Sequence, residues 1–207
     1  MKWPHNRSRL EAFSDGVFAF AATLMVVNFD MDSSLTFTKS TGTGFLSFFV
    51  TFFVLVALWW VHYNFFRRTN YVDNWIIALN AILLFVVLYY VFPLKNLVIS
   101  GMGEGVKTLE ALANLFVMYG IGFLLIFLCL SLMYYRAFKK SYKAENALYL
   151  FFYARHFAIF VFIAVVSVVL AYFQVAIDFG FPGMFYVFLG PLCYWHSRDF
   201  SKKFELN

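Results

Sequence analysis

The sequence predicts an all-α integral membrane protein with six transmembrane helices. Of its 207 residues, 63% are hydrophobic and only 13% are charged, and the mean hydropathy is +0.76. A soluble globular domain is about half apolar and about a quarter charged. Long apolar segments alternate with short polar ones along the chain, so a soluble domain is excluded.

The first apolar segment, Arg9–Asp30, is unusual because it opens with charged and polar side chains. Only the 14 residues from Gly16 to Phe29 are almost wholly apolar, whereas about 20 are needed to cross a bilayer. The charged first turns must therefore be sheltered by other helices or face water. Ionisable groups in such a position are candidates for function.

Five further apolar segments follow, and no long linker separates them. We therefore expect one six-helix domain over residues 1–207. The expected spans are 9–30, 44–66, 75–94, 111–135, 157–177 and 179–196.

The basic residues predict how the chain crosses the membrane. Thirteen of the 16 Lys and Arg residues fall on one side of this arrangement, and the other side has only Lys39, Lys95 and Lys107. Because cytoplasmic loops are rich in Lys and Arg, we expect both termini in the cytoplasm and the chain in the cell (inner) membrane. The net charge of +5 then reflects topology, and the expected surroundings are the lipid bilayer rather than nucleic acid.

The two cysteines, Cys129 and Cys193, both lie inside apolar segments. Two cysteines so far apart form neither a metal-binding pattern nor a disulfide framework. We expect two buried thiols and no cofactor.

A helical wheel divides the first segment into two faces. At about 100° per residue, one face collects Arg9, Phe13, Gly16, Phe20, Thr23 and Val27, with Asp30 at its edge. Ser14 and Asp15 point away from it. The division suggests one face directed toward a central axis and another that makes polar contacts inside the subunit. Ordinary packing of Phe13, Phe20 and Val27 is the alternative.

The spacing Arg9-x-x-x-Phe13-Ser14-Asp15 resembles the RxxxFSD signature in the first helix of the transmembrane protein 175 family, the lysosomal potassium channel and its bacterial relatives. The motif occurs once here, whereas animal members carry two copies of the six-helix unit. One unit per chain resembles the bacterial form, in which four subunits surround one axis. The resemblance implies a homotetrameric channel with the first helix of each subunit lining the pore, and a structural role for these four motif residues.

The second and third segments, LWWVHYNFFRR and NWIIALNAILLF, look like the same family. In that family, a Trp-containing second helix with a His near its cytoplasmic end precedes an Asn in the third. We expect Ser14 and Asp15 to form a polar network with His62 and Asn80 that pins the first helix against the next two. The alternatives are an interfacial His62 solvated by headgroups and an Asn80 that makes an ordinary helix–helix hydrogen bond.

In such a tetramer, four copies of Phe20, Thr23 and Val27 would form successive rings along the pore. Apolar rings can gate by excluding water, and a hydroxyl ring can replace part of an ion's hydration shell, so Thr23 is the candidate site for permeant K⁺. The tightest layers in the family are usually Ile or Leu, from which Phe20 and Val27 depart. Asp30 would form a carboxylate ring at the outer mouth. Alternatively, Thr23 hydrogen-bonds to its own helix and Asp30 is a solvated loop residue.

Catalysis has no support in the sequence, because no P-loop, dinucleotide fingerprint or HExxH motif occurs. A TVGYG filter and a voltage-sensing run of Arg are also absent. We therefore expect a potassium-permeable cation channel with passive conduction and no enzymatic activity. A proton-coupled secondary transporter using Asp15 and His62 and a non-conducting structural membrane protein are the alternatives, although transporters usually have broken helices and repeated halves.

Overall fold

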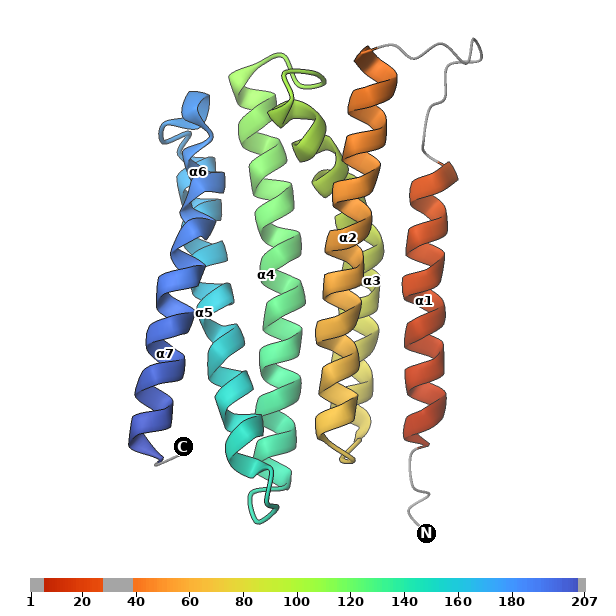
Figure 1. Cartoon of the computed structure of the whole chain (residues 1–207), viewed down its shortest axis with the longest axis vertical. Helices are drawn as coiled ribbons and strands as arrows, with labels where there is room; N and C mark the ends of the chain where they lie inside the picture. The colour runs from red at the N-terminus through yellow and green to blue at the C-terminus, as the bar shows by residue number, and fades with distance from the viewer. Residues whose placement is uncertain (1–5, 28–38, 205–207) are drawn as a thin grey trace.

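The computed structural model describes residues 6–27 and 39–204, apart from the side chains of residues 27 and 39–41. In this part of the chain, six helices of at least 15 residues lie roughly side by side (Figure 1). They are α1 (Arg7–Val27), α2 (Lys39–Arg68), α3 (Asn74–Gly101), α4 (Leu109–Lys140), α5 (Ala147–Tyr172) and α7 (Leu189–Lys203). The short segments η1 (Ile177–Phe179), α6 (Phe181–Met184) and η2 (Phe185–Phe188) connect α5 to α7. The predicted all-helical architecture is confirmed.

Four of the described helices are long and apolar enough to cross a membrane. They are Gly42–Arg68, Asn74–Gly101, Leu109–Lys140 and Ala147–Tyr172, with mean hydropathies between 2.2 and 2.5. At about 1.5 Å per residue, even the shortest is about 39 Å long and exceeds the hydrocarbon core of about 30 Å. The fold is that of a membrane protein.

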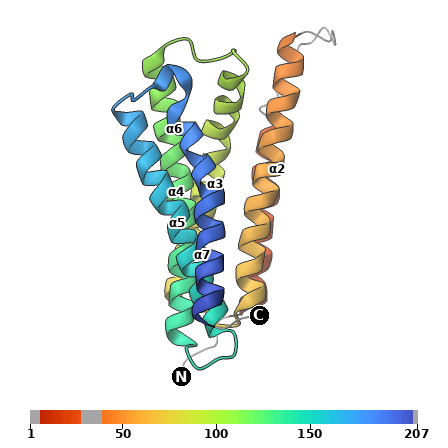
Figure 2. The same cartoon turned by 60° about the vertical axis from the view of Figure 1, so that its left-hand side comes forward.

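The helices form two neighbouring groups. Helices α1, α2 and α3 contact one another, α3, α4 and α5 pack in sequence order, and α7 lies against α5. Figure 2 shows α2 at one flank of the molecule and α5 at the other, with α7 between them in this view. The start of α1 and the end of α7 lie at the same end of the bundle as the turns 69–73 and 141–146 (Figure 1). The last turns of α2, α4 and α7, which lie at this end, all carry basic residues, so we call it the basic end.

The fifth helix begins earlier than the sequence predicted. The expected span 157–177 excluded Arg155 and His156, yet α5 runs from Ala147 to Tyr172. The exposed Arg155 guanidinium lies 5.8 Å from the centroid of the Phe151 ring, and the His156 ring stacks 5.4 Å from that of Phe152. Both side chains are thus accommodated by aromatic neighbours on the same helix, and the helix continues through them.

The expected sixth span, 179–196, is not one regular helix. After α5 the chain turns through Gln174 and Ala176, which both have positive φ, and through Gly180 with φ of 67°. Pro182 lies in the first turn of α6. The backbone N–H groups of a first turn have no partner within the helix, so the lack of an N–H in proline costs nothing there. The chain then passes through η2 before the regular turns of α7, which ends at Lys203 rather than His196.

Two glycines on α4 allow close packing of the central helices. A Cβ atom built on Gly120 would lie 2.6 Å from Cγ2 of Val168 on α5, and one on Gly122 would lie 2.6 Å from Cδ2 of Tyr90 on α3. Small residues at helix contacts let backbones approach in membranes, where no hydrophobic effect drives association. The sequence MYGIGF therefore serves packing rather than a selectivity filter.

Replacing Gly122 should destabilise the subunit. In Gly122→Ala the new methyl group overlaps the buried Tyr90 ring, and overpacking of this kind costs about 1–3 kcal/mol. Thermal unfolding in detergent should show a lower midpoint for this variant. Gly42→Ala is the control, since its Cβ meets nothing within 4 Å. Equal stability of the two variants would contradict the close α3–α4 contact.

Candidate functional site

Three polar side chains from three helices meet inside the first helix group. Asn80 on α3 lies between Ser14 on α1 and His62 on α2, and their exposed fractions are 1%, 0% and 2%. Its Nδ2 donates to Ser14 Oγ at 3.0 Å, and its Oδ1 lies 2.7 Å from His62 Nε2. The structure thus brings together three of the four residues expected in the polar network.

The direction of each hydrogen bond in this chain follows from the chemistry of the groups. Ser14 Oγ donates its single hydrogen to the Leu10 carbonyl at 2.8 Å, so it can only accept from Asn80. Asn80 therefore turns its amide nitrogen to Ser14 and its oxygen to His62. An amide oxygen only accepts, so His62 carries a hydrogen on Nε2. The Nδ1 atom of His62 is buried without a hydrogen-bond partner in the described part of the chain.

Asp15 does not join this chain of hydrogen bonds. Its side chain is exposed, and its Oδ1 accepts from Nε1 of Trp59 on α2 at 2.8 Å. Consecutive residues on a helix differ by about 100° in direction, so Ser14 faces α3 while Asp15 faces α2. Asp15 and His62 line one cavity of about 280 Å³, together with Arg7, Glu11, Tyr63 and Phe66. The motif therefore anchors α1 twice, once to each neighbouring helix.

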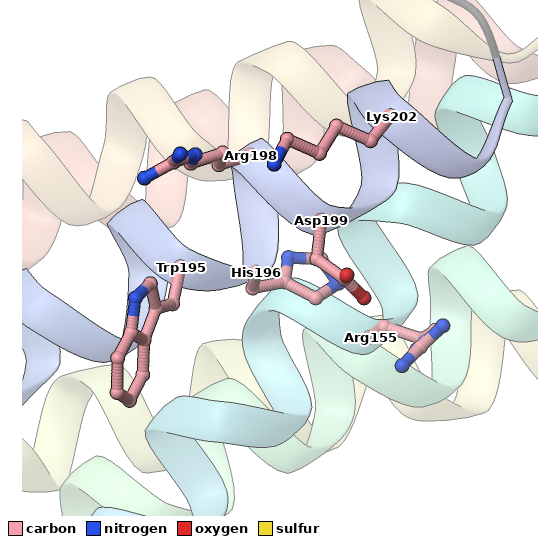
Figure 3. Close-up of a pocket in the computed structure, with 6 residues that line it drawn as sticks. All are labelled: Arg155, Trp195, His196, Arg198, Asp199 and Lys202. Atoms are coloured by element: carbon pink, nitrogen blue, oxygen red, sulfur yellow. The ribbon is translucent and has the colours of Figure 1, made fainter.

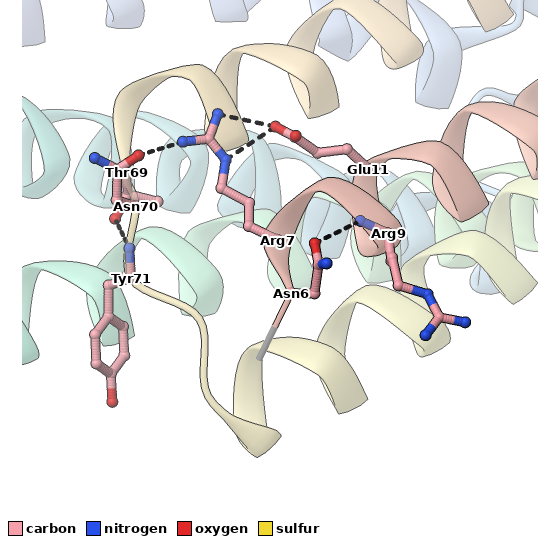
Figure 4. Close-up of polar contacts among 7 residues, drawn as sticks. All are labelled: Asn6, Arg7, Arg9, Glu11, Thr69, Asn70 and Tyr71. Atoms are coloured by element: carbon pink, nitrogen blue, oxygen red, sulfur yellow. Dashed lines mark hydrogen bonds and ion pairs between the residues drawn. The ribbon is translucent and has the colours of Figure 1, made fainter. Parts of the chain in front are cut away.

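A further polar contact ties the start of α1 to the turn after α2. The Arg7 guanidinium donates to Glu11 Oε1 at 2.9 Å and to Oδ1 of Asn70 (Figure 4). This contact was not predicted from the sequence. An Arg and a Glu four residues apart on a helix are neighbours, so the ion pair could have been found from spacing alone. Arg9 is exposed, and Figure 4 shows its side chain pointing away from these contacts.

The face predicted to look toward a central axis is exposed on this subunit. Phe13 is 63% exposed and Phe20 is 54% exposed, and Gly16 and Thr23 belong to the same exposed class. Thr23 follows Ser14 by nine residues, which puts it about 180° around the helix from the anchored side. The polar network and the exposed face thus occupy opposite sides of α1.

Thr23 makes the hydrogen bond that the sequence analysis named as its alternative role. Its Oγ1 donates to the Ala19 carbonyl at 3.0 Å. This bond uses the only hydroxyl hydrogen and leaves lone pairs on the oxygen, so it does not prevent the oxygen from facing a cation. Val27 is the last residue of α1 and its side chain is outside the described set, as is the whole of Asp30.

The comparisons with known proteins converge on one family. A family model described as "Endosomal/lysosomal potassium channel TMEM175" matches residues 9–93, the region that contains α2 and most of α1 and α3. A solved structure of a variant of the potassium channel MtTMEM175, bound to a nanobody fusion, superposes with a TM-score of 0.72 at 28% identity. That likeness covers 97% of this chain and 95% of the other. Residues 9–93 thus resemble the TMEM175 family, and nearly the whole chain resembles a solved TMEM175 channel.

Two further proteins resemble this chain. A protein of Marivirga tractuosa named "Potassium channel" is 36% identical over 150 residues, which are 65% of this chain and 61% of that protein. The chain therefore spans less than two thirds of this curated relative. A TMEM175 homologue from Chamaesiphon minutus, described as a lysosomal potassium-selective channel homologue, has a TM-score of 0.60 at 20% identity and covers 88% of this chain and 97% of its own. At that identity the likeness concerns the fold alone.

An ionic cluster outside the predicted site fixes the turn between α2 and α3 to α4. Asp73 accepts from the Ile76 backbone N–H at 3.0 Å, from Tyr71 Oη at 2.9 Å and from Arg136 at 2.8 Å. Partial burial alone would raise the pKa of the Asp73 carboxyl, but these hydrogen bonds and the Arg136 charge together hold it below its usual value. The ionised carboxylate therefore stabilises this end of the bundle.

Asp73→Asn should lower stability in a pH-dependent way. Because folding lowers the pKa of Asp73, its contribution is complete above the ordinary carboxyl value of about 4 and is lost as the pH falls through the folded-state pKa. Thermal unfolding in detergent should show the variant less stable than the parent at pH 7, with the difference shrinking toward pH 3. The exposed Glu145→Gln serves as the control. A difference that stays constant over this pH range would contradict the role of the carboxylate.

Asn80→Leu should weaken the attachment of α1. It removes two buried hydrogen bonds and leaves His62 Nε2 unpaired, which costs about 1–3 kcal/mol. We expect a lower midpoint of thermal unfolding in detergent. The control is Asn96→Leu on the same helix, which loses only a local bond to the Phe92 carbonyl. Comparable losses in both variants would show that α1 does not depend on the network.

Proposed function

We propose that this chain is a subunit of a potassium-permeable cation channel that conducts passively through a pore lined by α1 of four copies. The observation that carries the proposal is the division of α1 into an anchored side and an exposed side. Ser14, and with it Asp15, binds α1 to its own subunit, whereas Phe20 and Thr23 are left exposed on a subunit considered alone. A helix that lines a shared axis needs this combination. The relatives named as potassium channels agree with it.

Within the proposed pore, the residues of the exposed face have different tasks. Four Phe20 side chains would form an apolar constriction that excludes water when closed. Four Thr23 oxygens, one turn further along, would replace part of the hydration shell of K⁺. Val27 would add a second apolar ring and Asp30 a carboxylate ring at the mouth, in line with their positions in the sequence.

The proposed orientation has both termini in the cytoplasm of a cell (inner) membrane. The start of α1 and the end of α7 lie at the basic end of the bundle (Figure 1). Cytoplasmic flanks are enriched in Lys and Arg, which supports this orientation. The cavity that Asp15 and His62 line would then open near the cytoplasmic side.

That same cavity favours the second candidate, a proton-coupled transporter. Asp15 and Glu11 border it, and His62 keeps one nitrogen without a partner among the described residues. Such groups can relay protons. Against this candidate, α1 to α5 are continuous helices over their described lengths, without the discontinuous spans typical of transporters.

Ion flux from purified protein in liposomes distinguishes these functions. With K⁺ and Na⁺ gradients at a defined voltage, we expect a current that reverses near the potassium potential. Thr23→Ala should lower the preference for K⁺ over Na⁺ several-fold and leave the oligomer intact, because the hydroxyl ring is lost while the anchored side is untouched.

Thr51→Ala is the matched control for this experiment. Thr51 makes the same kind of bond, from Oγ1 to the Ser47 carbonyl at 2.7 Å, but it is buried on α2. Equal selectivity of the two variants and the parent would move the filter away from Thr23. A saturating flux that requires a proton gradient would favour the transporter, and absence of flux under all gradients would contradict both.

A further inference from the structure

A cavity of about 470 Å³ lies between α5 and α7, outside the site described above. It is lined by Arg155 of α5 and by Trp195, His196, Arg198, Asp199 and Lys202 of α7. The cavity lining thus carries three cationic side chains and one carboxylate. Figure 3 shows His196 and Asp199 pointing from α7 toward the side of Arg155, while the Lys202 ammonium points back along α7 toward Arg198.

The cations of this cavity have no strong internal partners. Among the described residues, the ion pairs within 4 Å are Arg7–Glu11 and Arg136–Asp73, and neither involves the cavity. The Arg155 guanidinium makes a weak contact with the face of the Phe151 ring, 5.8 Å from its centroid. The guanidinium and ammonium donors of Arg155, Arg198 and Lys202 therefore stay available for an anion, most favourably a phosphate.

The imidazole of His196 points to the same kind of ligand. Both ring nitrogens are buried and have no hydrogen-bond partner in the described part of the chain. One of them always carries a hydrogen, whichever tautomer is present. The ring lies between the aromatic rings of Phe152, with centroids 4.9 Å apart, and Phe200 at 6.0 Å, which offer no acceptor oxygen. An acceptor entering the cavity would supply the missing partner.

The depth of the cavity fits a lipid headgroup. Arg155 is the ninth residue of α5, which places it about 12 Å along the helix from the basic end. Long Arg side chains at that depth extend toward the membrane interface. Trp195, which is 69% exposed at the cavity, is the residue type that sits at the level of lipid headgroups.

The exposed stripe along η2 and α7 explains why the anion would be a lipid and not a free phosphate. Phe188, Pro191 and Trp195 are exposed at helical spacing, and Arg198 and Lys202 continue the same stripe toward the basic end. Apolar side chains are thus followed by cationic ones, in the order in which a phospholipid presents its acyl chain and its phosphate. A free phosphate would use only the basic half of this surface.

We propose that the cavity between α5 and α7 binds the phosphate of an anionic membrane phospholipid. Arg155, Arg198 and Lys202 bind the phosphate oxygens, and His196 donates to one of them. The apolar stripe through Trp195 and Phe188 contacts the acyl chain. Asp199 lowers the net positive charge of the cavity, which favours a headgroup with one negative charge over one with several.

Native mass spectrometry of the full chain in detergent tests this site. Phosphatidylglycerol and phosphatidylcholine with identical acyl chains are added in turn, and the bound lipid is counted. We expect more phosphatidylglycerol than phosphatidylcholine to be retained. In Arg198→Gln/Lys202→Gln the affinity for phosphatidylglycerol should fall by about tenfold or more, because each cation near an anionic lipid contributes substantially.

The matched control is Lys139→Gln/Lys140→Gln, which removes the same charge from the same end of the bundle at the exposed end of α4. This variant should bind phosphatidylglycerol as the parent does. An equal fall in both double variants would overturn the proposal, because the effect would then be general attraction to a basic surface. Tenfold molar excess of inorganic phosphate should leave the bound lipid in place, and complete displacement by it would overturn the lipid as the occupant.

Discussion

The chain of hydrogen bonds through Ser14, Asn80 and His62 is the constraint on which the rest of the first helix group depends. In a bilayer no water replaces a lost partner, so three buried polar groups on three helices are satisfied only when the helices keep one rotation and one depth. The Ser14 hydroxyl donates its hydrogen to the Leu10 carbonyl, and this fixes the direction of each hydrogen bond in the network. The network therefore fixes the rotation of α1 about its own axis. That selection decides which residues of α1 are left exposed.

The network could be predicted from the sequence because polar residues inside apolar segments have few possible partners. Ser14, His62 and Asn80 were expected together, and the structure brings them together. Asp15 was expected in the same network but binds Trp59 on α2. Trp59 belongs to the second apolar segment, but the sequence pattern does not show that its indole N–H points to α1. That direction depends on how α1 and α2 are rotated against each other, which sequence periodicity does not contain.

Prediction was less successful where aromatic packing and backbone turns replace simple periodicity. The expected fifth span began after Arg155 and His156, yet both lie inside α5 beside aromatic rings. The expected sixth span covered residues 179–196, but the pattern did not show that 3-10 turns separate α6 from α7. The positive φ values of Gln174 and Ala176 have no sequence signal, because neither is a glycine. Contacts between neighbouring turns and local backbone angles decide these conformations, and the apolar pattern does not contain them.

The hydrogen bond from Thr23 to Ala19 has a consequence for the sign of charge that the proposed pore admits. An anion is stabilised by donors, and the hydroxyl has already given its only hydrogen to the helix. The lone pairs of the Thr23 oxygen carry partial negative charge. They could replace part of the hydration shell of a cation, whereas chloride would lose its hydration without any replacement. A ring of such threonines would thus reject anions without carrying any charge of its own.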